Sequence, residues 1–558
     1  MAQYARYRAP AESGQKLIAP PWSELCRTVA GNVAWRRDTS LTVLGRPLVE
    51  FAADARREIL ERAAEYTSTY AGPTPPPLKG REQPSTVASG DRAQGGSLRE
   101  AQGGICSSPL IVTGHQPELI HPGVWVKNFA AAQLCASKGA VSLNLVIDGD
   151  ACRGPAIRVP AGTLDEPRWE SIPFDAPAPE MPWEERTIVQ PEQWQSFPRR
   201  VGTATQGLLD DRMLDQWWPL AMERAAATGR IGLGLAQARH LAEIDWGRRN
   251  LELPQSEMCQ TAAFRRFTLH LFNELPRFVD SYNAALDDYR RDHRLRNHAH
   301  QVPNLAVAGP WRQAPYWVWS AEVPTRRPVY LRREGGGLIV TDRQTFERRL
   351  PCVCDDGGDA AVAELAAWEA QGLKLRSRAL ITTMFARLAV ADLFIHGIGG
   401  AKYDEATDAI CVRHFGTAPP AFAAISGTLR LPIARDAGGG ESATALRQRL
   451  RDLTYHPEHA IDLANGSAAN GAATLVAAKR HWLATAKSPR NAAQRHHEIV
   501  AANDALQPYV GDVRASLERQ VAEANERSRS NRVLNSREYA ACLFPRKLLE
   551  QFLLDFPA

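Results

Sequence analysis

The hydrophobic and polar positions of residues 108–147 predict a strand, a helix and a second strand. Residues 110–113 form a short apolar run typical of a buried strand, and residues 140–147, AVSLNLVI, form another. Between them, helical i, i+3, i+4 and i+8 spacing connects Val126, Phe129, Ala130 and Leu134, and Gly139 ends the helix. A βαβ unit of this kind predicts two parallel strands joined by a right-handed crossover.

A similar pattern returns in residues 376–416. A helix that runs to about Asp392 precedes a short strand, a glycine loop from Gly397 to Gly400 and another helix. We expect this unit to belong to the same sheet. In the intervening region, roughly residues 160–370, Pro-rich loops alternate with short helices, and residues 314–342 have the pattern of strands joined by turns.

The two ends of the chain have other patterns. A helix is predicted from Pro47 to Tyr70, and the Pro-, Gly- and Ser-rich residues 73–107 predict a flexible linker. From about residue 440 the chain is helical and charged, with apolar residues mostly three or four apart, which favours an antiparallel helical arm. Pro508 predicts a kink or a helix boundary within that arm.

These patterns predict an α/β protein with a Rossmann-like parallel sheet and a C-terminal helical coiled-coil arm. We divide the chain into an N-terminal helical segment (1–72), the linker (73–107), a Rossmann-like α/β core with an inserted middle region (108–435), and the arm with the C-terminal segment (436–558).

Composition narrows the choice of partners. The formal net charge of +5 and the lack of basic runs interleaved with aromatics argue against nucleic acid. Nine scattered cysteines suit a reducing compartment, the N-terminus is polar, and no stretch reaches the roughly 20 apolar residues that span a bilayer. We therefore expect a cytoplasmic protein that acts on small molecules and does not bind a membrane.

Polar residues follow both strands of the first βαβ unit, at the edge where ligands bind in open parallel sheets. Thr113, Gly114, His115 and Gln116 follow the first strand, and Asp148, Gly149 and Asp150 follow the second. The sequence therefore places two polar clusters at one edge.

Each cluster has two interpretations. His115 and His121 could bind a phosphate or carboxylate together with the N–H groups that open the next helix, or they could cap a turn shaped by Pro117 and Pro122. Asp148 and Asp150 could orient or deprotonate an amine or hold magnesium, or they could form an aspartate turn with a helix cap. The spacing of His115 and His121 does not match a zinc helix or another strong metal motif, and no protein metal site is predicted.

Two further regions supply candidates for binding. After His396, Gly399 and Gly400 allow close backbone approach to a ligand, with Lys402 and Tyr403 at the start of the following helix. A tight packing turn explains the same glycines equally well. Arg326 and Arg327 could grip a carboxylate or phosphate beside the aromatic residues of the middle region.

At TGHQPELIHPG, VIDGDA and GIGGAKYDEATDAICVRHFGTAPPAF the chain resembles the bacillithiol-biosynthesis cysteine-adding enzymes, a cysteine ligase family. The resemblance covers about residues 108–150 and 375–435 and, more loosely, the arm. Thr113, Gly114, Gln116, Asp148, Asp150, Gly399 and Gly400 match the family's motifs, whereas His115 and Gly149 replace a Gln and a His.

This resemblance implies a ligase that forms a carbon–nitrogen bond between an amino acid, with cysteine as the candidate, and the amine of a sugar-derived acceptor. It implies ATP with magnesium as the candidate cofactor. His115 or His121 would then stabilise an activated carboxyl group, and Asp148 or Asp150 would orient or deprotonate the amine. For partners, we expect small-molecule substrates and a homodimer formed through the helical arm.

The start of the first motif also resembles the WbqC-like proteins of surface-glycan loci, through His115, Gln116, Pro117, Gly123 and Lys127. Both likenesses point to the fold of the HIGH-signature nucleotidyltransferases, with His121-Pro122-Gly123 as a partial signature. Two alternatives therefore stay open: a nucleotidyl- or glycosyl-type transferase in surface-glycan synthesis, and a non-catalytic binding scaffold.

Overall fold

A computed structural model describes residues 7–72, 108–136, 139–293, 302–351, 353, 357–433, 441–461 and 469–557. The predicted linker, residues 73–107, lies outside the described residues. The main sheet has six strands in the order β1-β18-β17-β4-β5-β10. Their bounds are Lys16–Ala19 (β1), Leu110–His115 (β4), Val141–Val146 (β5), Leu251–Pro254 (β10), Leu393–His396 (β17) and Phe422–Gly427 (β18).

Five of these strands are parallel, and only the edge strand β1 runs antiparallel, beside β18. The predicted parallel pairing of the first βαβ unit is confirmed: Leu110 pairs with Val141 and His115 with Val146. The later unit belongs to the same sheet, as predicted, because Leu393 pairs with Ile111 on the other side of β4. The protein is thus a mixed α/β structure whose main sheet is largely parallel.

Alternating side chains of β4 enter two different hydrophobic cores. Leu110 and Val112 join the core formed with α2 (Leu48–Ala71), α10 (Ala262–Asn273) and α11 (Leu275–Asp292). Ile111 joins the core formed with α4 (Pro122–Ala136), α7 (Leu214–Thr228), α8 (Ile231–Asp245) and α19 (Arg546–Leu554). Helices therefore cover both faces of the sheet, which explains why its central strands are almost wholly apolar.

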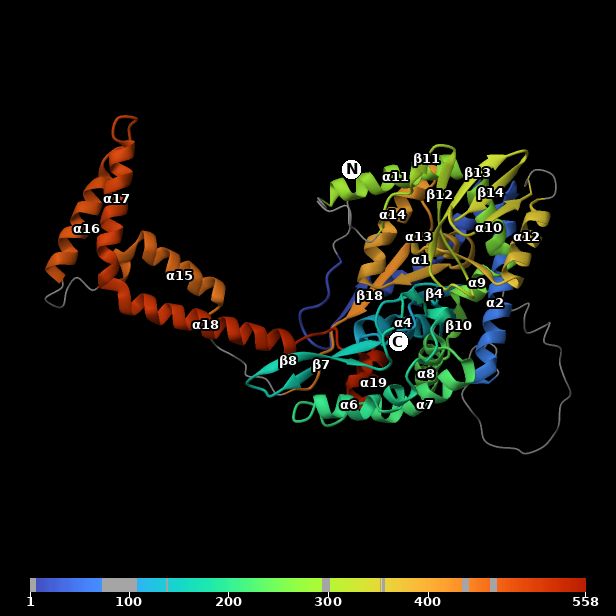
Figure 1. The fold of residues 1–558 in the computed structure, drawn as a ribbon, viewed down its shortest axis with the longest axis horizontal. Helices are drawn as coiled ribbons and strands as arrows, with labels where there is room; N and C mark the ends of the chain where they lie inside the picture. Colours follow the sequence, from blue (N-terminus) through green and yellow to red (C-terminus); the bar gives the residue numbers. More distant parts are fainter. Residues whose placement is uncertain are drawn as a thin grey trace.

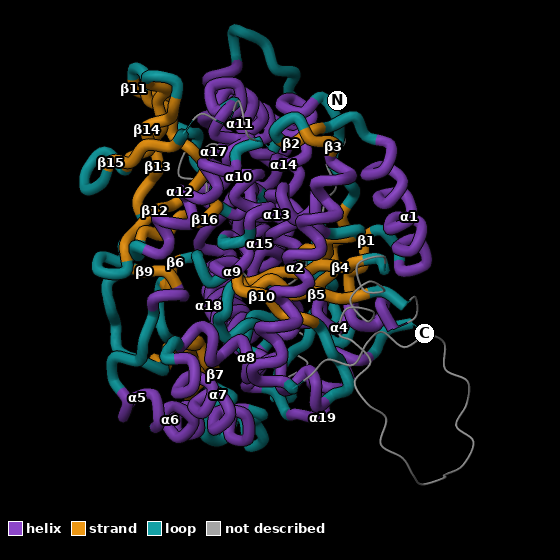
Figure 2. Tube along the Cα trace, turned by 90° about the vertical axis from the view of Figure 1, so that its right-hand side faces the viewer, coloured by secondary structure: helices purple, strands orange, loops and turns teal. Residues whose placement is uncertain are grey.

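The strands predicted in residues 314–342 belong to a separate antiparallel sheet, in the order β11-β12-β13-β14-β15, with β16 beside β12. Its strands are Val307–Ala308 (β11), Trp311–Ser320 (β12), Arg327–Glu334 (β13), Gly337–Thr341 (β14), Glu347–Leu350 (β15) and Leu373–Ser377 (β16). Figure 2 shows these strands as a group apart from those of the main sheet. This sheet is inserted in the chain between β10 and β17.

The helical arm extends away from the rest of the molecule (Figure 1). It consists of α15 (Ala443–Tyr455), α16 (Ala469–Ala484), α17 (Ala492–Leu506) and α18 (Gly511–Leu534). Hydrogen bonds from Arg447 to Asn525 and from Arg514 to Thr454 show that α15 and α18 are antiparallel. The boundary predicted at Pro508 is confirmed by a 3-10 turn, Gln507–Val510, between α17 and α18.

The C-terminal segment returns from the arm to the core, where α19 packs against α4. The remaining helices are α1 (Trp22–Asp38), α5 (Pro191–Gln195), α6 (Phe197–Ala204), α9 (Gln255–Cys259), α12 (Asp359–Ala370), α13 (Ala379–Phe385) and α14 (Ile398–Phe415). The short strand pairs are β2 (Thr42–Val43) with β3 (Arg46–Pro47), β6 (Ala151–Cys152) with β9 (Met181–Pro182), and β7 (Ala156–Gly162) with β8 (Pro167–Pro173). None of the described helices has both the length and the apolar character needed to cross a bilayer.

Candidate functional site

The strand order creates a topological switch point between β4 and β17. From β4 the chain proceeds to β5 and β10 on one side, and β17 and β18 lie on the other side. Connections that leave in opposite directions open a crevice at the carboxyl ends of the two strands, which is where open α/β sheets bind ligands. His115 is the last residue of β4 and His396 is the last residue of β17, so these two of the three candidate histidines lie at this edge.

Lys127, on the second turn of α4, is the basic group at the centre of this edge. It lines a small recess together with His115, Gln116, Asn128, Asn144 and Arg239. Its Nζ atom donates a hydrogen bond of 2.6 Å to the carbonyl oxygen of Gly114. Burial lowers the pKa of Lys127 to about 7, and the charge of Arg239 adds to this shift. Near neutral pH the lysine is therefore poised between its two protonation states.

His115 and His121 lie close enough to Lys127 for its charge to affect them. Burial, followed by the charge of Lys127, lowers the pKa of His115 to about 3. Burial, followed by Arg537 and Lys127, lowers the pKa of His121 to about 4. Both imidazoles are consequently neutral at pH 7.

The hydrogen bonds of these two neutral imidazoles fix their tautomers. Nδ1 of His115 lies 3.1 Å from the carbonyl oxygen of Gln116, which can only accept, so Nδ1 carries the proton and Nε2 keeps a lone pair. The backbone N–H of Gly123 donates to Nδ1 of His121 at 3.1 Å, so the proton of His121 is on Nε2. His121 is thus a helix cap whose Nε2–H is a donor, and His115 offers an acceptor.

His396 is held by the helix that follows it. Its Nε2 atom lies 2.8 Å from Oδ2 of Asp404, which also binds Arg387 at 2.6 Å. Burial lowers the pKa of His396 despite Asp404, and the charge of Lys127 contributes to the lowering. A β-carbon at Gly400 would lie 2.8 Å from Nδ1 of His396, so Gly400 makes room for this imidazole. The interpretation of Gly400 as a packing glycine is therefore the one that the structure favours.

A buried polar network supports the floor of the recess. Arg239 donates to Oε1 of Glu243 at 2.6 Å and also pairs with Glu252. Asn128 donates to Glu243 at 2.8 Å, and Asn144 donates to Glu252 at 2.7 Å. Because both carboxylates are matched by donors, the network keeps Arg239 fixed beside Lys127 without leaving a buried charge unpaired.

Asp148 is fully buried and is engaged with another part of the core. Its Oδ1 accepts from the backbone N–H of Ser256 at 2.9 Å, and its Oδ2 accepts from Oγ of the same serine at 2.5 Å. Burial raises the pKa of Asp148 to about 7, and the nearby charge of Glu184 adds to the rise. The structure thus favours the interpretation of Asp148 as a cap, here for α9.

Asp150 connects the recess with the antiparallel sheet. Gln116 donates to its Oδ2 at 2.9 Å, and Arg326 donates to its Oδ1 at 2.7 Å. Burial acts to raise the pKa of Asp150, but these two partners outweigh it and hold the pKa below its usual value. Arg326, from the loop before β13, also lies over the ring of Trp317. Asp150 is therefore an ionised acceptor beside Gln116.

The other predicted residues are divided between the edge and the rest of the molecule. Thr113 is buried, with Oγ1 near Asn128 and Asn144 at 3.2 and 3.0 Å. Arg327 points into its own sheet, where it pairs with Asp342 at 3.0 Å, so the predicted arginine pair is split. Lys402 and Gly399 are exposed on α14, Tyr403 is half-buried there, and a β-carbon at Gly399 would contact nothing.

Five polar residues of the recess and its floor were not anticipated: Asn128, Asn144, Arg239, Glu243 and Glu252. Their sequence signal is a polar side chain inside an otherwise buried element. Asn144 interrupts VSLNLV and Glu252 interrupts LELP, each in a strand of the parallel sheet. Arg239 and Glu243 are four residues apart on α8, which places them on one face of the helix.

Comparison of the sequence with models of known protein families finds no family that matches. A search of curated proteins likewise finds no match.

Proposed function

We propose that the chain is a carbon–nitrogen ligase that resembles the cysteine ligases of bacillithiol synthesis. It would join an amino acid, with cysteine as the candidate, to the amine of a sugar-derived acceptor. The observation that carries this proposal is Lys127, which is buried with a pKa of about 7 at the switch point, beside His115 and Arg239. A group of this kind gains a proton when an anion binds, and so it suits a carboxylate or a phosphoryl group.

The side chains around Lys127 suit the two requirements of amide formation, which are stabilisation of the activated carboxyl group and removal of a proton from the attacking amine. Lys127 and the Nε2–H of His121 would bind the negative charge on the carboxyl group and stabilise it as the bond forms. The Nε2 lone pair of His115 would receive a proton from the attacking amine, because an anion bound at Lys127 would raise the low pKa of His115. Asp150, ionised and held by Gln116, would accept a hydrogen bond from the same amine.

ATP would activate the carboxyl group either as an acyl phosphate, with release of ADP, or as an acyl adenylate, with release of pyrophosphate. The phosphate or AMP would then leave as the amine attacks and the amide bond forms. The recess lined by His115, Lys127 and Arg239 has a volume of about 10 Å³, room for one water molecule, so a phosphoryl or carboxylate group would enter it only if the surrounding side chains moved apart. The predicted magnesium ligands do not fit, since both oxygens of Asp148 are bound to Ser256 and Arg326 occupies one side of Asp150. We assign no step to magnesium.

Three structural expectations are part of the same proposal. The fold would be of the HIGH type, with His121-Pro122-Gly123 at the start of α4 as its partial signature. The arm would be a coiled coil, and it would also be the contact of a homodimer. Exposed large apolar residues on the arm support a contact there: Tyr455, Leu483, Val500, Tyr509 and Val513.

Trapping of the activated carboxyl group with hydroxylamine tests the proposed reaction without knowledge of the acceptor. The protein, ATP and cysteine should give cysteinyl hydroxamate, detected by mass spectrometry. Lys127→Met should lower the rate at least about 100-fold, the effect of removing one donor to a developing negative charge. Lys547→Met, at an exposed lysine on α19, is the matched control and should keep the wild-type rate.

The other outcomes separate the two alternatives. Release of pyrophosphate from a nucleotide and a sugar phosphate, with no hydroxamate, would favour the transferase. Binding of ATP or cysteine without either product would favour the binding scaffold. Equal hydroxamate formation by wild type and Lys127→Met would contradict the placement of the site.

A further inference from the structure

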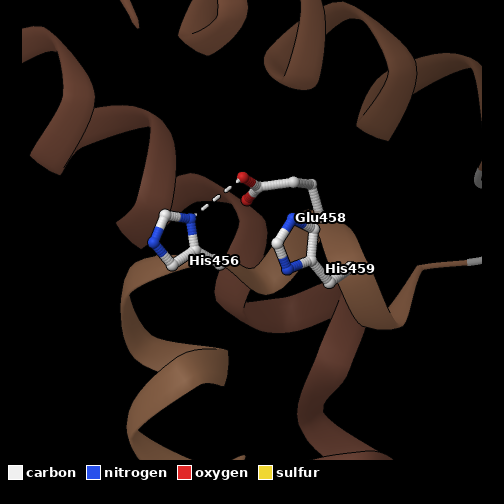
Figure 3. A group of neighbouring side chains, drawn as sticks. All are labelled: His456, Glu458 and His459. Carbon is white, nitrogen blue, oxygen red and sulfur yellow. Dashed lines mark hydrogen bonds and ion pairs between the residues drawn. The ribbon is translucent and has the colours of Figure 1, made fainter.

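A second cluster of chemically distinctive side chains lies far from the recess, in the arm. His456, Glu458 and His459 belong to the turn after α15, whose 3-10 helix spans Pro457–Ala460. Their nearest ligand atoms all lie within 4.8 Å of one another. In Figure 3 the two imidazole rings lie next to each other, with the Glu458 carboxylate beside both.

The short turn explains how three ligands come from four consecutive residues. His456 immediately precedes the 3-10 helix, and the backbone N–H of His459 donates a hydrogen bond of 3.1 Å to the carbonyl oxygen of His456, which closes the turn between the two residues. Their rings are nearly parallel, 9° apart in plane, with centroids separated by 5.3 Å. Nδ1 of His456 is 3.5 Å from Oε1 of Glu458, a separation close to that of two ligands on one tetrahedral zinc ion, about 3.4 Å for bonds of about 2.1 Å.

Glu458 is the best-fixed member of the cluster. Its Oε2 atom accepts a hydrogen bond of 2.6 Å from Nζ of Lys479, and Lys479 also donates to the carbonyl oxygen of Tyr455 at 2.7 Å. Lys479 is almost fully buried. The lysine thus holds one carboxylate oxygen and leaves Oε1 directed towards His456. Partners of this kind orient the ligands of metal sites.

We propose that His456, Glu458 and His459 bind a divalent transition metal ion of the zinc class. Two imidazole nitrogens and one carboxylate oxygen are ligands that Zn²⁺ accepts, and three protein ligands leave a fourth position for water or another group. Magnesium and calcium are disfavoured because they prefer oxygen ligands alone.

The position of the turn indicates what the metal would do. The turn contacts α15, α17 and the 3-10 turn Gln507–Val510. Ile461, directly after it, packs against both small hydrophobic cores of the arm, that of α15 with α18 and that of α16 with α17. A metal bound here would fix the joint between the two helical pairs.

The test is metal binding by the full-length protein after removal of metals with a chelator. Wild type should bind one more equivalent of Zn²⁺ than the double variant His456→Ala/His459→Ala, measured by competition with a chromophoric chelator. The matched control is His496→Ala/His497→Ala, two neighbouring histidines on α17 that should leave zinc binding unchanged. With Co²⁺, the same equivalent should give visible d–d absorption without a thiolate charge-transfer band, which excludes cysteine ligands.

A conservative variant and a stability measurement complete the design. Glu458→Gln removes the charged ligand with little change of shape and should weaken binding at least about tenfold. Saturating Zn²⁺ should raise the unfolding temperature of the arm in wild type but not in His456→Ala/His459→Ala. Equal zinc stoichiometry in wild type and that double variant would overturn the proposal, as would a wild type that binds no zinc.

Discussion

The pKa of the Lys127 amine is set by the buried site in which the side chain lies. On α4 its long side chain is buried and donates to the carbonyl oxygen of Gly114. The charge of Arg239 acts on Lys127, and the charge of Lys127 acts on His115, His121 and His396. Burial and like charge both oppose protonation of a lysine. The residue therefore contributes an amine that can gain or lose a proton at neutral pH, which an exposed lysine does not.

The lowered pKa of Lys127 makes protein stability depend on pH in a defined range. Between pH 7 and the ordinary lysine value of 10.5 the unfolded chain binds more protons at this residue than the folded protein. The free energy of unfolding must therefore rise with pH in that range. Relative to Lys127→Met, wild type should gain about 2 kcal/mol from pH 7 to pH 9, measured by urea denaturation. If the free energies of unfolding of wild type and Lys127→Met differ by the same amount at pH 7 and pH 9, the pKa of Lys127 is not lowered.

Asp148 should produce the opposite dependence at lower pH. Its pKa is raised to about 7 from 3.8, so the folded protein binds more protons than the unfolded chain between these values. The free energy of unfolding should fall as the pH rises from 5 to 7, by about 2 kcal/mol relative to Asp148→Asn. Asparagine keeps the shape but does not titrate. If the free energies of unfolding of wild type and Asp148→Asn change by the same amount from pH 5 to pH 7, Asp148 is ionised over this whole range.

At the scale of elements, two glycines in the first turns of α4 and α14 should respond differently to the same substitution. A β-carbon at Gly123 would lie 2.2 Å from the carbonyl oxygen of Gly427 on β18, whereas one at Gly399 would contact nothing. Gly123→Ala should therefore lower the free energy of unfolding by about 1–3 kcal/mol, and Gly399→Ala should leave it unchanged or raise it slightly. Thermal unfolding of the two variants distinguishes them, and equal stability would contradict the close approach of α4 to β18.

Hydrophobic spacing alone was sufficient to predict several elements and one pairing. A βαβ unit with two parallel strands was predicted from an apolar run at residue 110, a helical repeat from Val126 and a second apolar run that ends near Ile147. The structure confirms this unit as β4, α4 and β5. Pro508 also marked a true boundary, because a proline cannot donate the backbone hydrogen bond that a helix interior needs.

Strand order and long-range polar contacts could not be predicted in the same way. No local pattern indicates that β17 lies beside β4. Nor does any local pattern indicate that β1, near the N-terminus, forms the edge of the sheet beside β18. The partner of Asp150 is Arg326, 176 residues away, and the partner of Asn144 is Glu252. Such pairs depend on tertiary packing, so the sequence indicated the edge of the sheet but not the recess within it.

At the scale of the whole molecule, the arm and the core should fold separately. The small hydrophobic cores of the arm share no buried residue with the two large cores, and Leu534 at the end of α18 belongs to the same large core as Leu431 and Ile433. Replacing residues 436–532 with a short glycine linker should therefore leave a folded core, seen as a cooperative thermal transition. Loss of cooperative unfolding would show that the core needs the arm.

The central claim is that the recess at Lys127 binds the anionic group of the substrate. Isothermal titration with ATP and with cysteine, each at pH 7.5 in two buffers of different ionisation enthalpy, tests it most directly. For the ligand whose anion occupies the recess, wild type should take up about three quarters of a proton on binding, because Lys127 is mostly neutral at pH 7.5 before the anion arrives and protonated afterwards. Lys127→Met should lose this uptake and bind at least about tenfold more weakly. Equal affinity and equal proton uptake in the two proteins would contradict the account.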